Sequence, residues 1–324
     1  MRRNVLLLLA VSALALAAAE AALRSGPRPL WVIPYPPVCL RSDLFQRWDP
    51  YGYRLWPSRT TFLRWPATSG RAVRITANAE GFRMRHDLRA PAGRPRIVVV
   101  GDSMIFGLGV EEPERVTELL EAAEPGWRVD NMGMVGFGPD LMLMSFEAVG
   151  LDPPPAVVVV ALFTHDLYRV APEVDGVGFP VPRFALRDGN LARVPYPERP
   201  PWTRLYVVQG ARYLYWRYTS AAYPLDAAIL ERFAALARSR GFRLAIAFVP
   251  GPRERWDDRR RAAWVAAWAA AHDTPFVDLR AAIAVAGGER MYLPADAHWN
   301  PEGHRVAAAE LQRLLRPLVA EKGG

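Results

Sequence analysis

Two short segments far apart in the chain carry residue types suited to nucleophilic catalysis. Gly101-Asp102-Ser103 directly follows a β-branched run, and Asp296 stands two residues before His298 near the C-terminal end. A histidine oriented by a carboxylate takes the proton of a serine hydroxyl and so activates the oxygen for attack on an ester carbonyl. Together these residues predict a Ser-His-Asp site, although Ser103 alone would equally suit the N-cap of the following helix.

Two further segments offer hydrogen-bond donors for a negatively charged oxygen. Asn131-Met132-Gly133-Met134-Val135-Gly136 follows a second apolar run, where a glycine N–H can face a developing oxyanion. Phe163-Thr164-His165-Asp166 follows a third apolar run and brings polar side chains to the same edge. Each segment alone is also compatible with a plain turn or cap. We expect both at the site because they follow successive strands.

The positions of these segments indicate an α/β fold. Apolar runs predict five strands, over 97–100, 129–132, 157–162, 244–249 and 276–277. Continuous apolar runs are typical of parallel strands that are buried on both faces. Helical patterns alternate with them, over 113–123, 225–240, 256–271 and 301–316. Pro317 is expected to end the last helix. The alternation predicts a three-layer α/β/α sandwich whose polar segments meet at the carboxyl edge of the sheet.

The N-terminus has the pattern of an export signal or a short membrane anchor. Arg2 and Arg3 precede a largely apolar run from Val5 to Ala19, and Arg24 ends the segment. This order of charges places everything after Arg24 outside the cytoplasm. Small-residue steps such as Ala17-Ala18-Ala19 suit cleavage, and an uncut anchor suits the run equally well. Residues 1–24 are therefore predicted to be a signal peptide or an anchor.

The rest of the chain divides into a leading segment and one main domain. Residues 25–75 are rich in Pro, Arg and Trp without a helical period, which predicts an irregular segment packed on a domain over 76–320. Residues 167–224 interrupt the strand–helix alternation with a hairpin at 184–194 and then an aromatic, basic stretch. This insertion either packs on the domain edge, caps the site or faces a membrane.

Composition excludes several classes of protein. The 324 residues are 51% hydrophobic and 23% charged, which is ordinary globular usage and excludes disordered and fibrous chains. One cysteine, Cys39, rules out an intramolecular disulfide and a cysteine-built metal site. The net charge of +8 is spread over scattered arginines, so we expect no nucleic-acid partner. Gly-x-Ser-x-Gly, phosphate-loop and His-Glu-x-x-His motifs do not occur in the sequence.

Taken together, the motifs resemble those of the SGNH (GDSL-type) hydrolase family over roughly residues 76–320. The resemblance rests on Gly101-Asp102-Ser103, on the Asn-x-Gly-x-x-Gly stretch at 131–136 and on Asp296-Ala297-His298-Trp299. Residues 78–83, Asn-Ala-Glu-Gly-Phe-Arg, are similar to exported bacterial members. The resemblance implies a flavodoxin-like parallel sheet of about five strands and a site without a metal or organic cofactor.

The same resemblance assigns a role to each matching position. Ser103 is the nucleophile, and its own N–H is the first oxyanion donor. Gly136 matches the second oxyanion donor. His298 matches the general base, and Asp296 matches its acidic partner. Asp102, Asn131 and Asp166 are expected to be neighbours of the site.

In two places the sequence departs from the common family pattern. The third block ordinarily carries Asn-Asp, with the asparagine as third oxyanion donor, whereas this chain has His165-Asp166. A neutral imidazole donates there only if its N–H points inward. The acid–base pair is Asp-x-His-Trp in place of Asp-x-x-His, which looks like the SGNH-like polysaccharide O-acetyltransferases of the bacterial envelope.

These observations predict an exported serine esterase that acts on O-acyl esters, acetyl above all, of a cell-envelope glycan or lipid through an acyl-enzyme. The expected location is the periplasm or the periplasmic face of the inner membrane, with the membrane contacted through the N-terminal segment. Two alternatives remain: an O-acetyltransferase of an envelope polysaccharide, supported by Asp-x-His-Trp, and a non-catalytic glycan-binding protein, supported by His165. The other histidines, His86, His272 and His304, are expected to have surface or packing roles.

Overall fold

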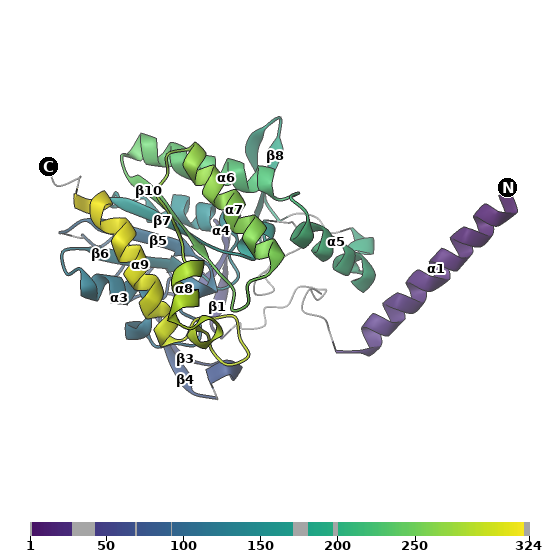
Figure 1. Cartoon of the computed structure of the whole chain (residues 1–324), viewed down its shortest axis with the longest axis horizontal. Helices are drawn as coiled ribbons and strands as arrows, with labels where there is room; N and C mark the ends of the chain where they lie inside the picture. The colour runs from purple at the N-terminus through teal and green to yellow at the C-terminus, as the bar shows by residue number, and fades with distance from the viewer. Residues whose placement is uncertain are drawn as a thin grey trace.

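A five-stranded parallel sheet forms the centre of the computed structural model, which describes residues 2–27, 43–68, 70–91, 93–170, 181–196 and 200–320 (Figure 1). Its strands are β5 (Arg96–Gly101), β6 (Arg128–Gly133), β7 (Val157–Phe163), β10 (Arg243–Val249) and β11 (Phe276–Asp278). Their spatial order is β11-β10-β7-β5-β6, which is the flavodoxin-like order. All five predicted strands are confirmed.

Helices cover both faces of this sheet. One face carries α4 (Pro139–Ser145), α6 (Tyr223–Arg240) and α7 (Trp256–Ala271), and the other carries α3 (Val116–Ala123), α8 (Arg280–Ala286) and α9 (Pro301–Ala320). Alternate residues of β5 enter the two cores: Val98 joins Phe233 of α6, and Val99 joins Leu315 of α9. The predicted three-layer α/β/α sandwich is confirmed.

Two helix boundaries differ from the prediction by about a turn, and α6 begins two residues earlier than expected. The helix expected from Pro113 begins at Val116, because Glu112–Glu114 form a separate 3-10 turn. The last helix does not stop before Pro317 and continues through it to Ala320. A proline inside a helix removes one backbone hydrogen bond. Here the burial of Leu318 and Val319 against the core keeps the final turn helical.

The prediction of an irregular segment over 25–75 is wrong for its described second half. This part forms two antiparallel hairpins, β1 (Phe45–Trp48) with β2 (Gly52–Leu55), and β3 (Thr60–Arg64) with β4 (Ala72–Thr76). The strands are too short to show a clear alternation of polar and apolar residues. Tyr53 packs edge-on against Phe137, with ring centroids 5.3 Å apart, so the first hairpin contacts the loop after β6. Residues 28–42, including Cys39, lie outside the described residues.

The interruption expected at 167–224 contains the predicted hairpin and one further helix. β8 (Arg183–Arg187) pairs with β9 (Asn190–Val194), and both strands pack against α6. Buried Arg183 donates to Asp140 of α4 at 3.0 Å, which fixes this hairpin on the domain edge. The aromatic stretch forms α5 (Tyr206–Tyr218). Residues 171–180 and 197–199 lie outside the described part of the chain.

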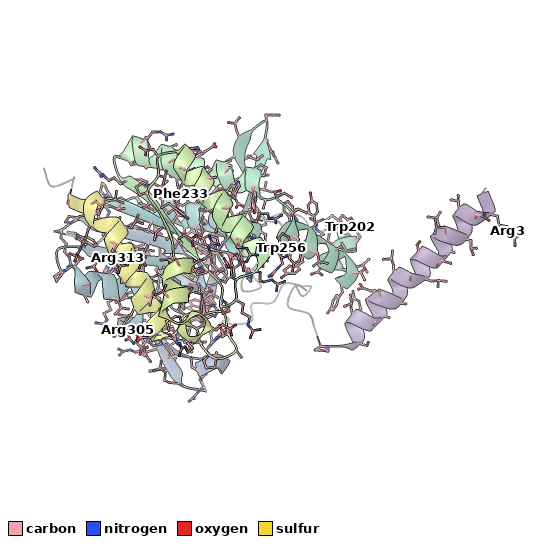
Figure 2. All side chains as sticks on the ribbon, viewed as in Figure 1. Arg3, Trp202, Phe233, Trp256, Arg305 and Arg313 are labelled. Atoms are coloured by element: carbon pink, nitrogen blue, oxygen red, sulfur yellow. The ribbon has the colours of Figure 1, made fainter. Side chains whose placement is uncertain are left out.

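The N-terminal run forms one long helix, α1 (Arg2–Ser25). Figure 1 shows it leaving the domain on the side of α5, and in Figure 2 most of its side chains stand clear of the rest of the molecule. Within the described residues, α1 is the helix that is long and apolar enough to cross a membrane, with a mean hydropathy of 2.3. A signal sequence has the same properties.

Candidate active site

Ser103 lies at the point where the strand order of the sheet reverses. It is the first residue of α2 (Ser103–Phe106), directly after β5, which lies between β6 and β7. The turn is tight, because a Cβ on Gly101 would lie 2.4 Å from Ile105 Cγ1. Asp102 caps α2 by accepting the Met104 N–H at 2.8 Å. This turn carries the serine hydroxyl to the carboxyl edge of the sheet, where open α/β sheets bind their ligands.

The three residues predicted to act together form one hydrogen-bonded chain. Ser103 Oγ lies 2.8 Å from His298 Nε2, and His298 Nδ1 bonds Asp296 Oδ1. Burial by itself raises the pKa of the Asp296 carboxyl, but hydrogen bonds from His298 and Trp65 lower it to about 2. The carboxylate is therefore ionised at physiological pH. A carboxylate on Nδ1 holds the proton there and leaves Nε2 free to accept the serine proton.

Trp65 completes the hydrogen bonding of the acidic residue. Its indole Nε1–H donates to Asp296 Oδ2 at 2.7 Å, and its ring stands edge-on to His298 with centroids 5.8 Å apart. Trp65 directly follows β3, in the segment that was expected to be irregular. Trp65 could not be predicted from the sequence, because 231 residues separate it from Asp296 and no local motif marks it.

The loop after β6 presents the glycine expected to bind the oxyanion. Gly136 has φ 81°, a left-handed conformation that favours glycine. The Tyr53 hydroxyl donates to the Val135 carbonyl at 2.5 Å, and the same planar peptide unit carries the Gly136 N–H. That bond fixes the direction of the N–H. Within the described residues, neither the Ser103 amide nor the Gly136 amide donates a hydrogen bond, so both remain available to a ligand.

Asn131 is buried and supports the site without facing it. Its amide Nδ2 donates to the Ile105 carbonyl at 2.7 Å and to Thr117 Oγ1 at 2.8 Å, while its Oδ1 accepts the Gly133 N–H. These bonds hold the end of β6 against α2. The approach is close, because a Cβ on Gly133 would lie 2.4 Å from the Phe106 nitrogen. Asn131 therefore positions the serine turn.

His165 is a neutral, mostly buried imidazole in the turn that follows β7. Its ring packs against Phe163 and Tyr168, with centroid distances of 4.9 Å and 5.5 Å. Burial, followed by the positive charges of Arg217 and Arg169, lowers the pKa of His165 well below its usual value. The ring is neutral at physiological pH and keeps one N–H donor, whose position depends on the tautomer.

Arg169 joins the three segments that follow β5, β6 and β7. It donates to Asp102 Oδ2 at 2.8 Å and to the Phe137 carbonyl at 3.3 Å, and it bonds Asp166 Oδ1. Burial and the nearby Asp102 charge raise the pKa of Asp166 well above its usual value. Arg169 thus holds together the serine turn, the Gly136 loop and the His165 turn. Arg169 is not among the predicted site residues, although its spacing of three residues from Asp166 suits a helical ion pair.

Replacing Arg169 with glutamine is expected to lower kcat about 100-fold with little change in KM, because small displacements of reacting groups cost rates of this order. Steady-state kinetics with an acetyl ester will measure it. Arg232→Gln, which removes an exposed pair with Glu147, is the matched control and should keep the wild-type kcat. If the single variant is unstable, Arg169→Gln with Asp166→Asn avoids leaving a charge unpaired. An unchanged kcat in a folded variant would exclude this positioning role.

The last residues of the Asp-x-His-Trp motif and the helix after it belong to the core. Trp299 is buried and stands edge-on to His304, with centroids 5.5 Å apart. His304 Nδ1 accepts the Val116 N–H at 3.2 Å and so caps α3. His272 stacks on Trp268, and His86 bonds Asp130 at 2.7 Å. These three histidines have the packing or surface roles that were expected.

The buried His304 predicts a loss of stability in mild acid. Burial, with the charges of Arg115 and Arg83, lowers its pKa from 6.5 to about 3. Below pH 6.5 His304 binds a proton in the unfolded chain but stays neutral in the folded chain. Its contribution to the free energy of unfolding is therefore greatest above pH 6.5 and is lost as pH falls toward 3. The expected slope is about 1.4 kcal/mol per pH unit.

Urea unfolding between pH 7 and pH 5 tests this prediction. His304→Asn keeps an acceptor for the Val116 N–H but does not titrate, so its free energy of unfolding should fall less steeply with acid than that of the wild type. Ser239→Ala, which removes a hydroxyl that does not titrate in this range, should keep the wild-type slope. Equal slopes for His304→Asn and the wild type would contradict the assignment.

Comparison with known proteins gives a family and a set of similar structures. The model of the GDSL-like Lipase/Acylhydrolase family matches residues 99–306. Similar solved structures include a lipolytic protein of the G-D-S-L family from Desulfitobacterium hafniense DCB-2, with 15% identity, a TM-score of 0.45 and coverage of 68% of this chain and 100% of that chain. A member of the same lipolytic family from Veillonella parvula DSM 2008 has 16% identity, a TM-score of 0.44 and coverage of 67% and 96%.

A third similar structure is the acetyl xylan esterase AlAXEase, with 13% identity, a TM-score of 0.44 and coverage of 67% of this chain and 98% of that chain. No curated protein matches the sequence significantly. The matched region 99–306 contains Ser103, Gly136 and His298, whereas Tyr53 and Trp65 lie before it.

Proposed function

This chain belongs to the GDSL-like lipase/acylhydrolase (SGNH) family, and we propose that it is an exported serine esterase that removes O-acyl groups, acetyl above all, from a cell-envelope glycan or lipid. The observation that carries the proposal is the series of hydrogen bonds from Ser103 Oγ through His298 to Asp296, with 2.8 Å between Oγ and Nε2. The two free amides of Ser103 and Gly136 add donors of the kind that acyl transfer requires.

The reaction proceeds through an acyl-enzyme. Ser103 Oγ attacks the ester carbonyl carbon while His298 Nε2 takes the hydroxyl proton, and the carbonyl oxygen becomes an oxyanion bound by the Ser103 and Gly136 amides. The bond to the alcohol then breaks, and His298 returns the proton to the leaving oxygen. Water repeats the sequence on the acyl-enzyme and releases the acid. Asp296 remains ionised and stabilises the imidazolium in both halves.

His165 would supply the third oxyanion donor, in the position where the family ordinarily has asparagine. Its place in the turn after β7, at the edge of the sheet where Ser103 follows β5, supports this role, and its neutral ring keeps one N–H to donate. One donor of this kind contributes about 10²–10³ in rate. A rate contribution of this size from His165 would favour an active esterase over a binding protein that has kept only the fold.

The Asp-x-His-Trp motif supports an alternative reaction, in which the same acyl-enzyme passes its acyl group to an acceptor other than water. A sugar hydroxyl in place of water would make the protein an O-acetyltransferase of an envelope polysaccharide. Trp299 itself is buried in the core, so it supports the position of His298 and not an acceptor site. Acetate release without any added glycan would favour hydrolysis. Acetyl transfer that appears only after a glycan is added would favour the transferase.

The N-terminal helix supports export. We propose that residues 1–24 export or anchor the chain, and that the domain over 76–320 acts in the periplasm or at the periplasmic face of the inner membrane. The length, the apolar character and the lack of burial of α1 support this location. Arg2 and Arg3 at its start support a cytoplasmic N-terminus.

Labelling with a fluorophosphonate tests the catalytic assignment. The full chain in detergent should take up one label per molecule at Ser103, identified by peptide mapping. Ser103→Ala should take up none, and His298→Ala should react far more slowly because the serine keeps its proton. Ser145→Ala, which removes a buried hydroxyl bonded to the Met142 carbonyl, should label like the wild type. A folded protein that takes up no label would reject the esterase and favour the glycan-binding alternative.

A further inference from the structure

The end of α1 is fastened to the beginning of α5. The Glu20 carboxylate accepts the backbone N–H groups of Tyr206 and Val207 at 3.0 Å and 2.9 Å. These are amides of the first turn of α5, which have no partner inside the helix. Arg24 donates to Glu20 at 2.5 Å and to the Arg204 carbonyl at 3.3 Å, and its guanidinium lies 4.7 Å from the centre of the Tyr206 ring. A residue of one helix therefore caps the other.

The outer face of α5 is apolar, which is the reverse of an ordinary surface helix. Leu214 and Tyr215 are 53% and 55% exposed, whereas Gln209 and Arg217 are buried. Trp202, just before the helix, is 53% exposed and lies on the side of the domain that faces α1 (Figure 2). We call Trp202, Leu205, Leu214 and Tyr215 the α5 apolar surface.

The sequence that carries this surface is basic, and the acidic group nearby is Glu20 of α1, which caps the start of α5. No acidic residue occurs in the sequence between Glu198 and Asp226, whereas this stretch contains Arg204, which is exposed, and Arg212, whose guanidinium lies over the Trp202 ring. Tryptophan and tyrosine rings favour the headgroup layer of a bilayer, and arginines favour its anionic phosphates. A water-exposed surface of this composition is unusual, and a lipid surface suits both its apolar and its charged residues.

The position of α1 places a bilayer next to α5. A helix able to span a membrane ends at Ser25, and its last turns touch the first turn of α5. Any bilayer around α1 therefore lies beside α5. Figure 1 shows α5 between the sheet domain and α1. The opposite face of α5 leads back to the site, since Arg217 donates to the Tyr168 hydroxyl at 3.3 Å and the Tyr168 ring packs on His165.

We propose that α5 is an interfacial helix that lies in the outer headgroup layer with the α5 apolar surface in lipid, and that α1 is retained as its membrane anchor. The inference rests on the proposed export, and it assigns a second element to the membrane. Cleavage after Ala19 would remove α1 and leave Glu20 as a chain end, so retention of α1 is part of the inference. The esterase site would then lie close to the bilayer, where acylated lipids and lipid-linked glycans are found.

Fluorescence of the full chain in phosphatidylethanolamine–phosphatidylglycerol vesicles tests the contact. In a Cys39→Ser background, Leu214→Cys carries an environment-sensitive dye. Val285→Cys on α8, which replaces another exposed apolar residue with 89% exposure, is the matched control. Nitroxide-labelled lipid should quench the dye at 214 several-fold more than the dye at 285. Equal quenching by lipid, or shielding of the dye at 214 from both lipid and aqueous quenchers by a second copy of the chain, would overturn the inference.

A second variant tests the connection between the helices. Glu20→Ala removes the cap of α5, so lipid quenching at 214 should fall while α1 still holds the protein on the vesicles. Glu310→Ala, which removes a surface pair with Arg313 on α9, should leave the quenching unchanged. Unchanged quenching in Glu20→Ala, or a mature protein in membranes whose mass lacks residues 1–19, would overturn the inference. Fluorophosphonate labelling of the same samples reports on Ser103 separately, so that a failure of lipid contact leaves the proposed esterase intact.

Discussion

Ester hydrolysis is expected to fall by about 10⁴-fold or more in kcat/KM when Ser103 is replaced by alanine, because the acyl-enzyme cannot form without its hydroxyl. The residual rate would come from the Ser103 and Gly136 amides, which still polarise a bound carbonyl. Initial rates with p-nitrophenyl acetate measure the loss. The alanine removes only the bond to His298 at 2.8 Å and a longer one to Asp102 at 3.4 Å.

The fold of this variant should be unchanged, since the backbone cap of α2 by Asp102 remains. Thermal unfolding of Ser103→Ala therefore separates lost chemistry from lost structure. Ser145→Ala supplies the comparison for removal of a buried hydroxyl and should keep the wild-type rate. Wild-type activity in Ser103→Ala would assign the nucleophile elsewhere and reject the proposed mechanism.

Replacing Asp296 with asparagine is expected to lower kcat by about 10⁴-fold. The amide cannot stabilise the imidazolium, and an amide N–H facing Nδ1 would place the ring proton on Nε2, where the serine proton must go. The pKa of Asp296 is lowered to about 2, so the carboxylate acts above that pH and its contribution disappears only as pH falls toward 2. Rates measured from pH 5 to pH 9 should therefore show the loss at every pH.

Trp65→Phe provides a graded comparison for Asp296→Asn. It removes one donor to the carboxylate but keeps an aromatic ring beside His298, so kcat should fall only about tenfold, the equivalent of one charged hydrogen bond. Asp278→Asn, which breaks a partly exposed pair with Arg280, should leave kcat unchanged. A loss for Asp296→Asn that is no larger than the loss for Trp65→Phe would contradict the role of a catalytic carboxylate.

The strands could be predicted because local patterns reveal them, and so could Ser103, His298 and Asp296. Buried parallel strands are continuous apolar runs such as Val157–Phe163, and a parallel sheet collects whatever follows its strands at one edge. Ser103 and Gly136 each follow such a run. His298 is recognisable by its carboxylate neighbour two residues earlier. Strand ends therefore predict the place of Ser103 and Gly136, whereas a local motif predicts the pair of His298 and Asp296.

The supporting residues could not be predicted in this way. Trp65 and Tyr53 lie on short hairpins without clear alternation, and each acts on a residue far away in the sequence: Asp296 for Trp65 and the Val135 carbonyl for Tyr53. α5 was left undefined because its exposed face is apolar, which hides the usual helical pattern. Pro317 misled the prediction of α9, since tertiary burial of Leu318 and Val319 outweighs one lost hydrogen bond.

The separation of 195 residues between Ser103 and His298 has a consequence for the life of the newly made chain. Synthesis runs from the N-terminus at about 5–20 residues per second, so Ser103 emerges about 10–40 s before His298. During that interval the hydroxyl is an ordinary alcohol with no group to take its proton. Trp65 is likewise synthesised long before Asp296, to which it donates a hydrogen bond in the folded protein. If Ser103 acts as proposed, the nascent chain is chemically inert toward esters along its route of synthesis, and reactivity begins only when the segment that carries His298 docks on the sheet.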